Sequence, residues 1–519
     1  MKLTDKQTKQ LEWASSGARP FFLIGFAGLL LYLQTLAFDF IFYDDNLLIA
    51  NNYHFLSSLS NIPEAFLQGT WLMLHNQDAY YRPLLTISFM MDARGELAPL
   101  NYHFSNIFYH VAASCLFFSV LQKLGISRIY ACCGALLFTV HPVLSQSVAW
   151  IGGRNDVLLS IFILASFLFF IRHMETKKIS HLLFHLLFFA AGMLTKESAI
   201  VLPGVCMLYL YLFHRPFGKY ALLFSSWAGV FLAWYLLRSS AVESLPGQLA
   251  PLVILKSLFY HSPALLIYTG KIIMPFNLSV MPVMQMTSYW YGAFSLLIII
   301  TGIWFCKKRQ SRLIWLGFAW FLLFLLPSLL SSGASAQDNF VIREDRIYLP
   351  LMGAIIGLLA LAPAEKTIKM PGIILAGIAL VFCTFFFLTR QHSKNFNDRL
   401  SFWSAAAAHS PSYAFAHLHL GDALLAKEQF EEAIKEYRLT LELNPGEQVI
   451  HNNLGVLYLR KNLLNEAEQE FLNELKINPG YSSSYLNLGL VYSRQSRFPE
   501  AEQMWTTALS LNPDDITTY

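Results

Sequence analysis

The stretch Phe38-Asp39-Phe40-Ile41-Phe42-Tyr43-Asp44-Asp45-Asn46 follows directly on the first long apolar run of the chain, residues 21–37. That run is long enough for a membrane helix, so two adjacent carboxylates, Asp44 and Asp45, stand just beyond a membrane exit. Acidic side chains near hydrocarbon are costly and usually mark a functional site. The alternative is a solvated acidic loop that only ends the helix.

The composition indicates a membrane protein with a polar part attached. Of the 519 residues, 55% are hydrophobic and 13% are charged, whereas a soluble domain has about 25% charged residues. The net charge of +4 is too small to indicate a nucleic-acid partner. The six cysteines lie within apolar runs without metal-ligand spacing, and we interpret them as core residues.

The distribution of Lys and Arg on the short links predicts the topology, because positive residues favour the cytoplasmic side. We expect a multi-pass protein of eleven spans with a cytoplasmic N-terminus, a long first outer loop at 38–101, and an interfacial or re-entrant helix at 252–274. The C-terminal part then lies on the outer face, which is the periplasm of a bacterium or the lumen of the endoplasmic reticulum. The expected spans are 21–37, 103–121, 129–149, 157–171, 181–194, 198–213, 220–237, 290–306, 313–330, 347–362 and 371–388.

Beyond Arg390 the sequence repeats with a period of 34 residues. The Leu-Gly pairs that begin at Leu420, Leu454 and Leu488 keep this spacing, and so do three Ala, three Pro and three aromatic positions. This pattern is typical of tetratricopeptide repeats, in which small residues sit at close helix contacts. We therefore predict an all-α protein: a membrane helix bundle at 1–390, a connecting helix or linker at 391–413, and a soluble α-solenoid at 414–519. Its three repeats are 414–447, 448–481 and 482–515, and the segment 398–410 is expected to pack at the N-terminal end of the repeats.

Several charged residues are expected on the outer face close to the membrane, where buried charges need partners. Structural ion pairs could explain each one singly, but the set favours a site that binds phosphate and holds a carboxylate base. The cations are Arg82, Arg154, Lys196, Lys271, Arg343 and Arg346, and the carboxylates are Asp44, Asp45, Asp156, Glu197, Glu344 and Asp345.

An ordered series of short motifs accompanies this charge pattern. It consists of Phe42-Tyr43-Asp44-Asp45, Tyr81-Arg82-Pro83-Leu84, Asn101-Tyr102-His103-Phe104-Ser105-Asn106, His141-Pro142 through Val148-Ala149-Trp150 to Arg154-Asn155-Asp156, Thr195-Lys196-Glu197-Ser198, and Glu344-Asp345-Arg346 before Tyr348-Leu349-Pro350. With the repeats, this series resembles the transmembrane and tetratricopeptide-repeat O-mannosyltransferases and their bacterial relatives. These are GT-C class enzymes that use a sugar linked to a lipid phosphate.

The resemblance implies an inverting glycosyl transfer to a hydroxyl acceptor, such as a protein Ser or Thr. Asp44 or Asp45 would act as the base, with Asp44 narrowly preferred, and the donor phosphate and sugar would be bound by Arg82, Arg154, Asp156, Lys196, Glu197, Arg346 and Tyr348. Candidate acceptor-site residues are Trp71, His75, Tyr81, His103 and His141, although each histidine is more often structural. A cofactor is not required, and Asp44 with Asp45 could hold a divalent cation. The expected partners are the bilayer, a polyprenyl-phosphate sugar, and a protein or peptide in the groove of the repeats.

Two other function classes stay open. One is a transferase or ligase that acts on a glycan or a lipid, with the repeats as a dock for a partner. The other is a non-enzymatic membrane anchor that displays the repeats as a scaffold, but a scaffold does not require opposed charges clustered on the outer loops.

Overall fold

The computed structural model describes residues 16–70, 80–94, 97–214, 220–242, 251–306, 310–330, 340–362 and 372–512. Within these ranges the chain is helical and forms no strand, which confirms the predicted all-α class. The chain divides into two compact units. The first consists of Met1–Ser279 and Met284–Asp398, and the second of Val280–Val283 and Arg399–Tyr519.

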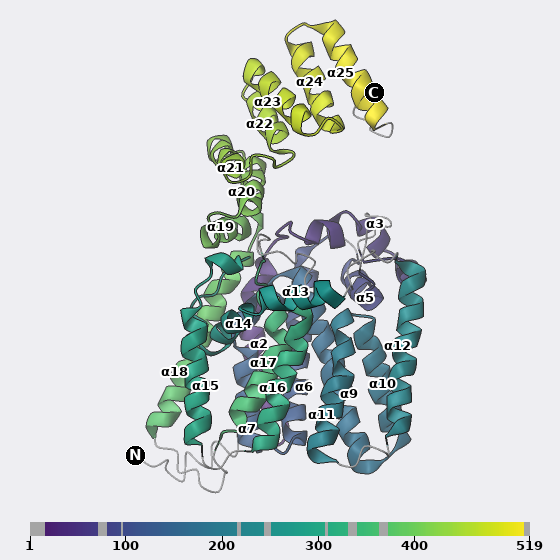
Figure 1. Ribbon diagram of the computed structural model, residues 1–519, viewed down its shortest axis with the longest axis vertical. Coiled ribbons are helices and arrows are strands. Elements are labelled where there is room, and N and C mark those ends of the chain that lie inside the picture. The colour runs from purple at the N-terminus through teal and green to yellow at the C-terminus, as the bar shows by residue number, and fades with distance from the viewer. Residues whose placement is uncertain are drawn as a thin grey trace. The chain divides into compact units, whose positions relative to one another are not determined.

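The first unit is a bundle in which most long helices run side by side (Figure 1). Its α-helices are α2 (Arg19–Tyr32), α3 (Tyr53–Leu56), α4 (Ile62–Ala65), α5 (Pro83–Asp92), α6 (Pro99–Lys123), α7 (Arg128–Thr139), α8 (Ser145–Ala149), α9 (Arg154–Thr176), α10 (Ile179–Met193), α11 (Leu202–Phe213), α12 (Ala221–Ala241), α13 (Pro251–His261), α14 (Ala264–Ile273), α15 (Trp290–Phe305), α16 (Ser311–Leu325), α17 (Tyr348–Leu359) and α18 (Gly372–Ser393). The short 3₁₀ and π segments that matter below are η1 (Leu33–Ala37), η2 (Asn46–Ala50), η5 (Pro142–Leu144), η6 (Ile151–Gly153), η7 (Glu197–Val201) and η11 (Glu344–Ile347).

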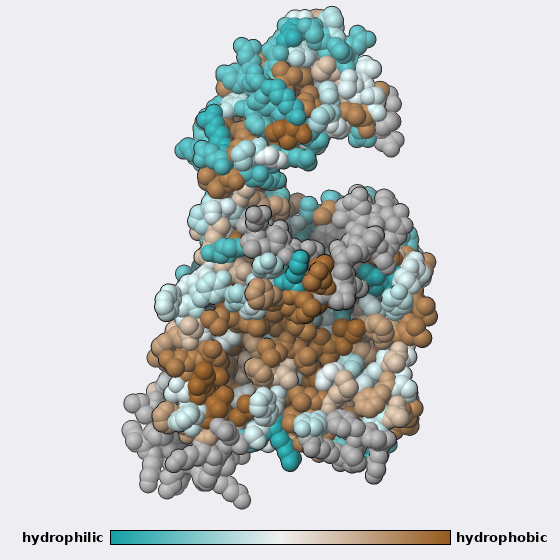
Figure 2. Space-filling view, viewed as in Figure 1, coloured by the Kyte–Doolittle hydropathy of each residue, from teal (hydrophilic) through white to brown (hydrophobic). Residues whose placement is uncertain are grey.

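The helices of this unit identify a multi-pass membrane protein. Hydrophobic surface covers the middle of the bundle (Figure 2). In the described part of the chain, five single helices are long and apolar enough to cross a membrane, and two bent helix pairs raise this number to seven. Four shorter apolar helices accompany them. The count of eleven crossings therefore stays a prediction. The five helices are Arg19–Ala37, Pro99–Lys123, Ile151–Thr176, Ala221–Ala241 and Ser311–Leu329.

Two predicted apolar segments contain a sharp break. The sequence predicts one continuous span at 129–149, but α7 ends at Thr139, and the chain bends by 48° before α8. Pro142 has no N–H to continue the helical ladder, and its ring favours a boundary at the preceding residue. In the second segment, α13 and α14 meet at an angle of 46°, and α13 lies across the direction of the long helices (Figure 1).

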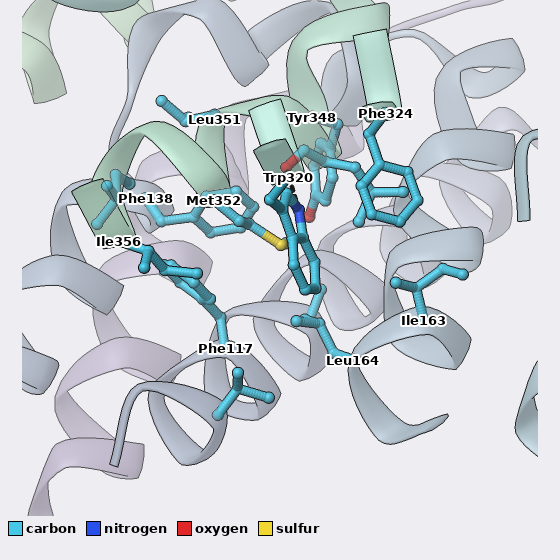
Figure 3. Close-up of a cluster of buried hydrophobic side chains, with 14 of the residues drawn as sticks. Phe117, Phe138, Ile163, Leu164, Trp320, Phe324, Tyr348, Leu351, Met352 and Ile356 are labelled. Atoms are coloured by element: carbon cyan, nitrogen blue, oxygen red, sulfur yellow. Dashed lines mark hydrogen bonds between the residues drawn. The ribbon is translucent and has the colours of Figure 1, made fainter. Parts of the chain in front are cut away.

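The core of the bundle centres on Trp320, whose side chain is fully buried beside Met352 and Leu164 (Figure 3). Its indole N–H donates to the carbonyl oxygen of Leu349 at 3.0 Å. This hydrogen bond offsets the cost of burying the N–H group away from water. Close contact between α16 and α17 depends on Gly317, where a Cβ would lie 2.5 Å from a backbone oxygen of the facing helix. Small residues at helix crossings are typical of membrane bundles.

The second unit contains the repeats. One helix pair falls within each predicted repeat, and residues 513–515 of the third repeat lie outside the described residues. Gly421 packs against the ring of Tyr437 so closely that a Cβ would come within 2.5 Å of the ring, and the same contact recurs one and two periods later. The helices of this unit are α19 (Arg399–His409), α20 (Ala414–Ala426), α21 (Phe430–Leu443), α22 (Ile450–Arg460), α23 (Leu464–Ile477), α24 (Ser482–Arg494) and α25 (Phe498–Leu511).

Helix α19 covers the first repeat helix, α20. Trp403 of α19 is fully buried, and its ring lies 4.4 Å from that of His419 on α20. Asp422 connects the neighbouring elements, because its carboxylate accepts hydrogen bonds from Tyr437 at 2.7 Å and Asn453 at 3.0 Å. This confirms the prediction that the segment 398–410 packs at the N-terminal end of the repeats.

Candidate functional site

The loop after η1 presents the acidic pair, and the two carboxylates have different surroundings. Asp45 is buried, and its oxygens accept hydrogen bonds from the backbone N–H of Ile41 at 3.0 Å and the indole N–H of Trp150 at 3.1 Å. Asp44 is half-buried, and no described residue donates a hydrogen bond to its carboxylate. Phe42, two residues earlier, has a positive φ of 55°, and such strain in a non-glycine residue concentrates at functional sites.

Burial changes the proton affinity of both acids. The pKa of Asp44 is raised by burial, against the attraction of Arg343, Arg346 and Arg82, which lowers it. Burial raises the pKa of Asp45 to about 7, although the hydrogen bonds from Ile41 and Trp150 favour the charged form. Both carboxylates therefore have a raised pKa, which is common at sites of proton transfer.

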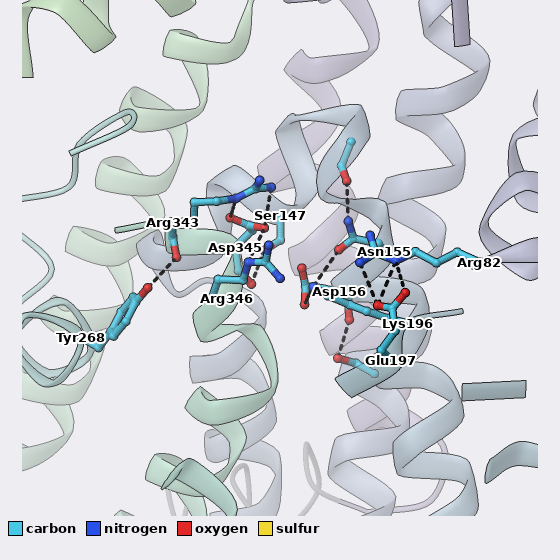
Figure 4. Close-up of polar contacts among 12 residues, drawn as sticks. Arg82, Ser147, Asn155, Asp156, Lys196, Glu197, Tyr268, Arg343, Asp345 and Arg346 are labelled. Atoms are coloured by element: carbon cyan, nitrogen blue, oxygen red, sulfur yellow. Dashed lines mark hydrogen bonds and ion pairs between the residues drawn. The ribbon is translucent and has the colours of Figure 1, made fainter. Parts of the chain in front are cut away.

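The short 3₁₀ turn η11 and the residue before it bring two arginines, Arg346 and Arg343, to the carboxylate of Asp345. Asp345 is fully buried and binds Arg343 through two parallel contacts of 3.1 Å, to Nε and Nη2. Nε of Arg346 lies farther away, 3.8 Å from the same carboxylate. Burial alone would raise the pKa of Asp345, but the two guanidinium groups outweigh it and hold this pKa below its usual range. Figure 4 shows the three side chains as one cluster.

A second group of ion pairs lies opposite this turn (Figure 4). Nζ of Lys196 is 2.6 Å from Asp156 Oδ1 and 3.1 Å from the Asn155 amide oxygen. Arg82 contacts both carboxylate oxygens of Glu197, the shortest contact being 2.9 Å. The pKa of Lys196 falls to about 7, chiefly through burial and then through repulsion by Arg346, while Asp156 opposes the decrease.

These charges form one electrostatic cluster from five separate segments of the chain. Asp44 interacts with Arg82, Arg343 and Arg346, and Lys196 interacts with Arg346 and Arg82. The contributing segments are the loop after η1, the residue before α5, the start of α9, the link from α10 to η7, and η11. Of the predicted catalytic and donor-site residues, the fold brings together Asp44, Asp45, Arg82, Asp156, Lys196, Glu197 and Arg346.

Arg154, a predicted donor-site residue, makes its contacts with a different set of residues. Its side chain is fully buried and 2.6 Å from the carboxylate of Asp92. It also donates hydrogen bonds to Asn106, Ser88 and Tyr102. The guanidinium donors are thus occupied by the protein itself, and we interpret Arg154 as a residue that joins α9 to α5 and α6.

Tyr348 likewise differs from its predicted role. It is fully buried among core side chains such as Phe138 and Met352 (Figure 3). Its hydroxyl lies 2.7 Å from Nδ1 of His110 on α6. It is therefore a core residue of α17.

The predicted acceptor residues are buried or lie outside the described residues. Tyr81 donates from its hydroxyl to the carbonyl oxygen of Phe66 at 2.9 Å. Nε2 of His141 is 2.9 Å from the carbonyl oxygen of Ile272, and His141 also caps η5. His103 is 1% exposed and packs edge-on against Phe38. No acceptor role follows from these contacts. Trp71 and His75 lie outside the described residues.

Two features were missing from the predicted site. Arg343 stood among the outer charges but was not assigned a role, although the Arg-Glu-Asp-Arg run at 343–346 was a visible signal. The second feature is a buried hub around Glu344. Its carboxylate contacts Lys271 at 2.6 Å and His392 at 3.1 Å, and its backbone N–H donates to Gln146. No sequence signal pointed to His392, because it follows an apolar run without a motif.

The residues present do not fit a divalent cation at the acidic pair. The oxygens of Asp45 accept N–H donors, and Asp44 faces three guanidinium groups. Within the ranges that the structure describes, no group of three or more His, Cys, Asp or Glu side chains could hold a metal ion.

Comparison with known proteins gives two family matches. Residues 85–242 match dolichyl-phosphate-mannose-protein mannosyltransferases, and residues 402–448 and 418–482 match tetratricopeptide repeats. Protein O-mannosyl-transferase TMTC2 of Homo sapiens is 36% identical over 36% of this chain and 23% of its own length. Protein O-mannosyl-transferase F38B6.6 of Caenorhabditis elegans is 24% identical over 83% of this chain and 64% of its own length.

The chain resembles the TMTC-type O-mannosyl-transferases. This confirms the resemblance found from the sequence motifs and supports a GT-C type membrane domain. TMTC4 of Homo sapiens extends the similarity, with 25% identity over 80% of this chain and 65% of its own length. The chain thus spans about a quarter of the first of these relatives and less than two thirds of the others. The mannosyltransferase match includes Lys196 and Glu197, but it includes neither the acidic pair nor η11.

Among solved structures, the TPR domain of OM64 from Arabidopsis is 23% identical, with a TM-score of 0.20 over 20% of this chain and 87% of that chain.

Proposed function

We propose that this protein is a membrane glycosyltransferase that moves a sugar from a polyprenyl-phosphate donor to a hydroxyl group on the outer face. The observation that carries the proposal is the Asp44 carboxylate, which is half-buried, accepts no hydrogen bond from a described residue, and is attracted electrostatically by three arginines. The O-mannosyl-transferase relatives support the same reaction class. They also favour a protein acceptor.

In this proposal Asp44 takes the proton of the acceptor hydroxyl as a general base. The hydroxyl oxygen forms a bond to the anomeric carbon while the bond from that carbon to the phosphate oxygen breaks, so the configuration inverts. The electron pair leaves with the lipid phosphate. Asp45 is less accessible to the acceptor, because it is buried and its two oxygens accept hydrogen bonds from Ile41 and Trp150.

The cations opposite Asp44 would stabilise the departing phosphate. Arg346 has the longest ion-pair contact of the cluster, 3.8 Å, and a side chain that is 29% exposed, so it can turn toward a ligand at little cost. Lys196 and Arg82 are near enough to one another to add charge from the other side. Charge-assisted contacts to phosphate are strong in such partly buried sites.

The proposal is tested by incubating the purified protein with labelled polyprenyl-phosphate sugars, each with a panel of Ser- and Thr-containing peptides, glycans and lipids. We expect transfer from one donor to a peptide hydroxyl and an inverted anomeric configuration in the product. Transfer to a glycan or lipid alone would replace the proposed acceptor class. No transfer from any donor by folded protein would overturn the glycosyltransferase proposal and favour a scaffold.

A further inference from the structure

Arg343 is held by a buried carboxylate and two aromatic rings. Its guanidinium makes two parallel contacts of 3.1 Å with Asp345, a carboxylate without solvent exposure. The same guanidinium lies 5.0 Å from the ring centroid of Trp150 and 6.0 Å from that of Tyr43. A planar guanidinium held by a carboxylate on one side and aromatic rings on the other keeps its charge in one place.

The turn that carries Arg343 is itself fixed from three directions. Glu344 contacts Lys271 of α14 and His392 of α18, and its N–H donates to Gln146 of α8 at 2.9 Å. The hydroxyl of Tyr268 also reaches the carbonyl oxygen of Arg343 at 3.5 Å. Both the backbone and the side chain of Arg343 are therefore restrained before any substrate binds.

The rings that hold Arg343 belong to the environment of the acidic pair. Tyr43 directly precedes Asp44, and Trp150 donates its indole N–H to Asp45. The two rings lie 5.6 Å apart. The charged and titratable groups that face Asp44 are Asp45 and Tyr43 on its own loop, Arg82 before α5, and Arg343, Asp345 and Arg346 of the η11 turn. Among the cations, Arg343 attracts Asp44 most strongly.

We propose that Arg343 is a positioning residue for Asp44: held by Asp345, Trp150 and Tyr43, it keeps a fixed positive charge near the carboxylate and so favours its ionised form. This rests on the proposed function for Asp44. Arg346 then has a different role, because its looser contact with Asp345 leaves it free for the donor phosphate. In this proposal Arg343 acts on the base, and Arg346 acts on the leaving group.

The experiment compares Arg343→Gln and Arg343→Lys in the full-length protein. One measurement is the pH profile of kcat/KM, in which the acid limb reports the ionisation of the base. The other is carbodiimide labelling of Asp44 followed by mass spectrometry, without substrate, as a function of pH. Labelling requires the protonated carboxyl, and it is normalised to the exposed Glu431. Arg343→Gln should raise both midpoints by about one pH unit, the usual effect of losing a nearby cation. Arg343→Lys, which keeps the charge, should stay close to the wild type.

Two controls separate this role from others. Arg346→Gln should mainly raise KM for the donor, and Lys123→Gln, at an exposed pair with Glu175, should match the wild type. Unchanged midpoints in Arg343→Gln would overturn the proposal. Labelling needs no turnover, so an upward shift of the Asp44 midpoint in Arg343→Gln supports the coupling even if no donor is used. In that case only the proposed function fails.

Discussion

Asp44 and Asp45 are neighbours in sequence, but the loop that carries them places their carboxylates in different surroundings. Asp45 connects this loop to the segment after α8 through Trp150, where Gly152 is required because a Cβ would lie 2.5 Å from the indole ring. The carboxylate of Asp44 makes no such connection to another described segment. The sequence could only prefer Asp44 narrowly, whereas the hydrogen bonds give a physical reason for the choice.

The first prediction concerns this pair. Asp44→Asn should lower turnover about a hundredfold or more, because the proton acceptor is lost while the shape is kept, and donor binding should change little. Arg346→Ala should weaken donor binding as well as turnover, since a contact to phosphate exists before the reaction. Steady-state kinetics and separate binding of the lipid phosphate distinguish the two effects. Full turnover in Asp44→Asn with loss in Asp45→Asn would reverse the assignment.

Arg154 gives the second prediction. Arg154→Met should destabilise the membrane unit by about 3–5 kcal/mol, because it leaves the buried carboxylate of Asp92 uncompensated. Thermal unfolding can be followed by the reaction of a thiol dye with the buried Cys132 and Cys206. Lys123→Met, at an exposed ion pair, is the matched control and should change stability by less than about 1 kcal/mol. If the Arg154→Met protein is as stable as the wild type but fails to bind the donor, Arg154 is a ligand of the donor phosphate and the prediction is wrong.

At the scale of elements, a histidine–carboxylate contact between α20 and α21 makes the packing of the repeats sensitive to pH. His417 of α20 lies 2.6 Å from the carboxylate of Glu436 on α21, and its second ring nitrogen lies 3.0 Å from the carbonyl oxygen of Pro411. Two oxygen partners require two N–H groups, which only the protonated ring has. The hydrogen bond to Glu436 raises the pKa of His417 above its ordinary value. The same pairing recurs 34 residues later, between His451 and Glu470.

The third prediction follows from the sign of this shift. A raised folded-state pKa adds stability that is fully present below about pH 6.5, the unfolded value, and is lost as the pH rises through the folded value. Glu436→Gln should therefore increase amide hydrogen exchange in α20 and α21 at pH 6 but have little effect at pH 9. Exchange is compared between the two proteins at equal pH, which cancels intrinsic rates. An equal difference at both pH values would contradict the prediction.

At the scale of the whole molecule, orientation in the membrane is the fourth prediction. The Lys and Arg distribution predicts a cytoplasmic N-terminus and repeats on the outer side. Reporter fusions after residues 125 and 395 should report cytoplasm and exterior, respectively. Because the charged cluster depends on the same orientation, a cytoplasmic signal at residue 395 would contradict the proposed reaction on the outer face.

The fifth prediction concerns the role of the repeats. Stacked helix pairs form a concave surface that suits an extended polypeptide. Deleting 412–519 should leave the membrane unit folded but impair transfer to a protein acceptor. Because α19 packs on α20, deleting 399–519 avoids exposing Trp403 and is the cleaner variant. Transfer to a short peptide should be less affected, and unchanged transfer to the full protein acceptor would identify the repeats as a spacer.

By itself, the sequence determined the class of the protein, because period and apolar length are local properties. A 34-residue repeat with Gly421 and Tyr437 in fixed register specifies paired helices, and long apolar runs specify membrane helices. The acidic pair and the cations of the motifs could also be listed from the sequence. The sequence could not show which charged side chains contact one another, because Arg154 and Lys196 are both isolated cations between apolar runs.

Only the tertiary structure distinguished the surroundings of Arg154 from those of Lys196. Burial and hydrogen-bond partners come from other segments: Arg154 is paired with Asp92 of α5, whereas Lys196 faces the arginine of η11. The core position of Tyr348 depended in the same way on a neighbouring helix, because its hydroxyl meets His110 of α6. A side chain takes its role from the groups that lie around it, and those groups are set by the packing of distant segments.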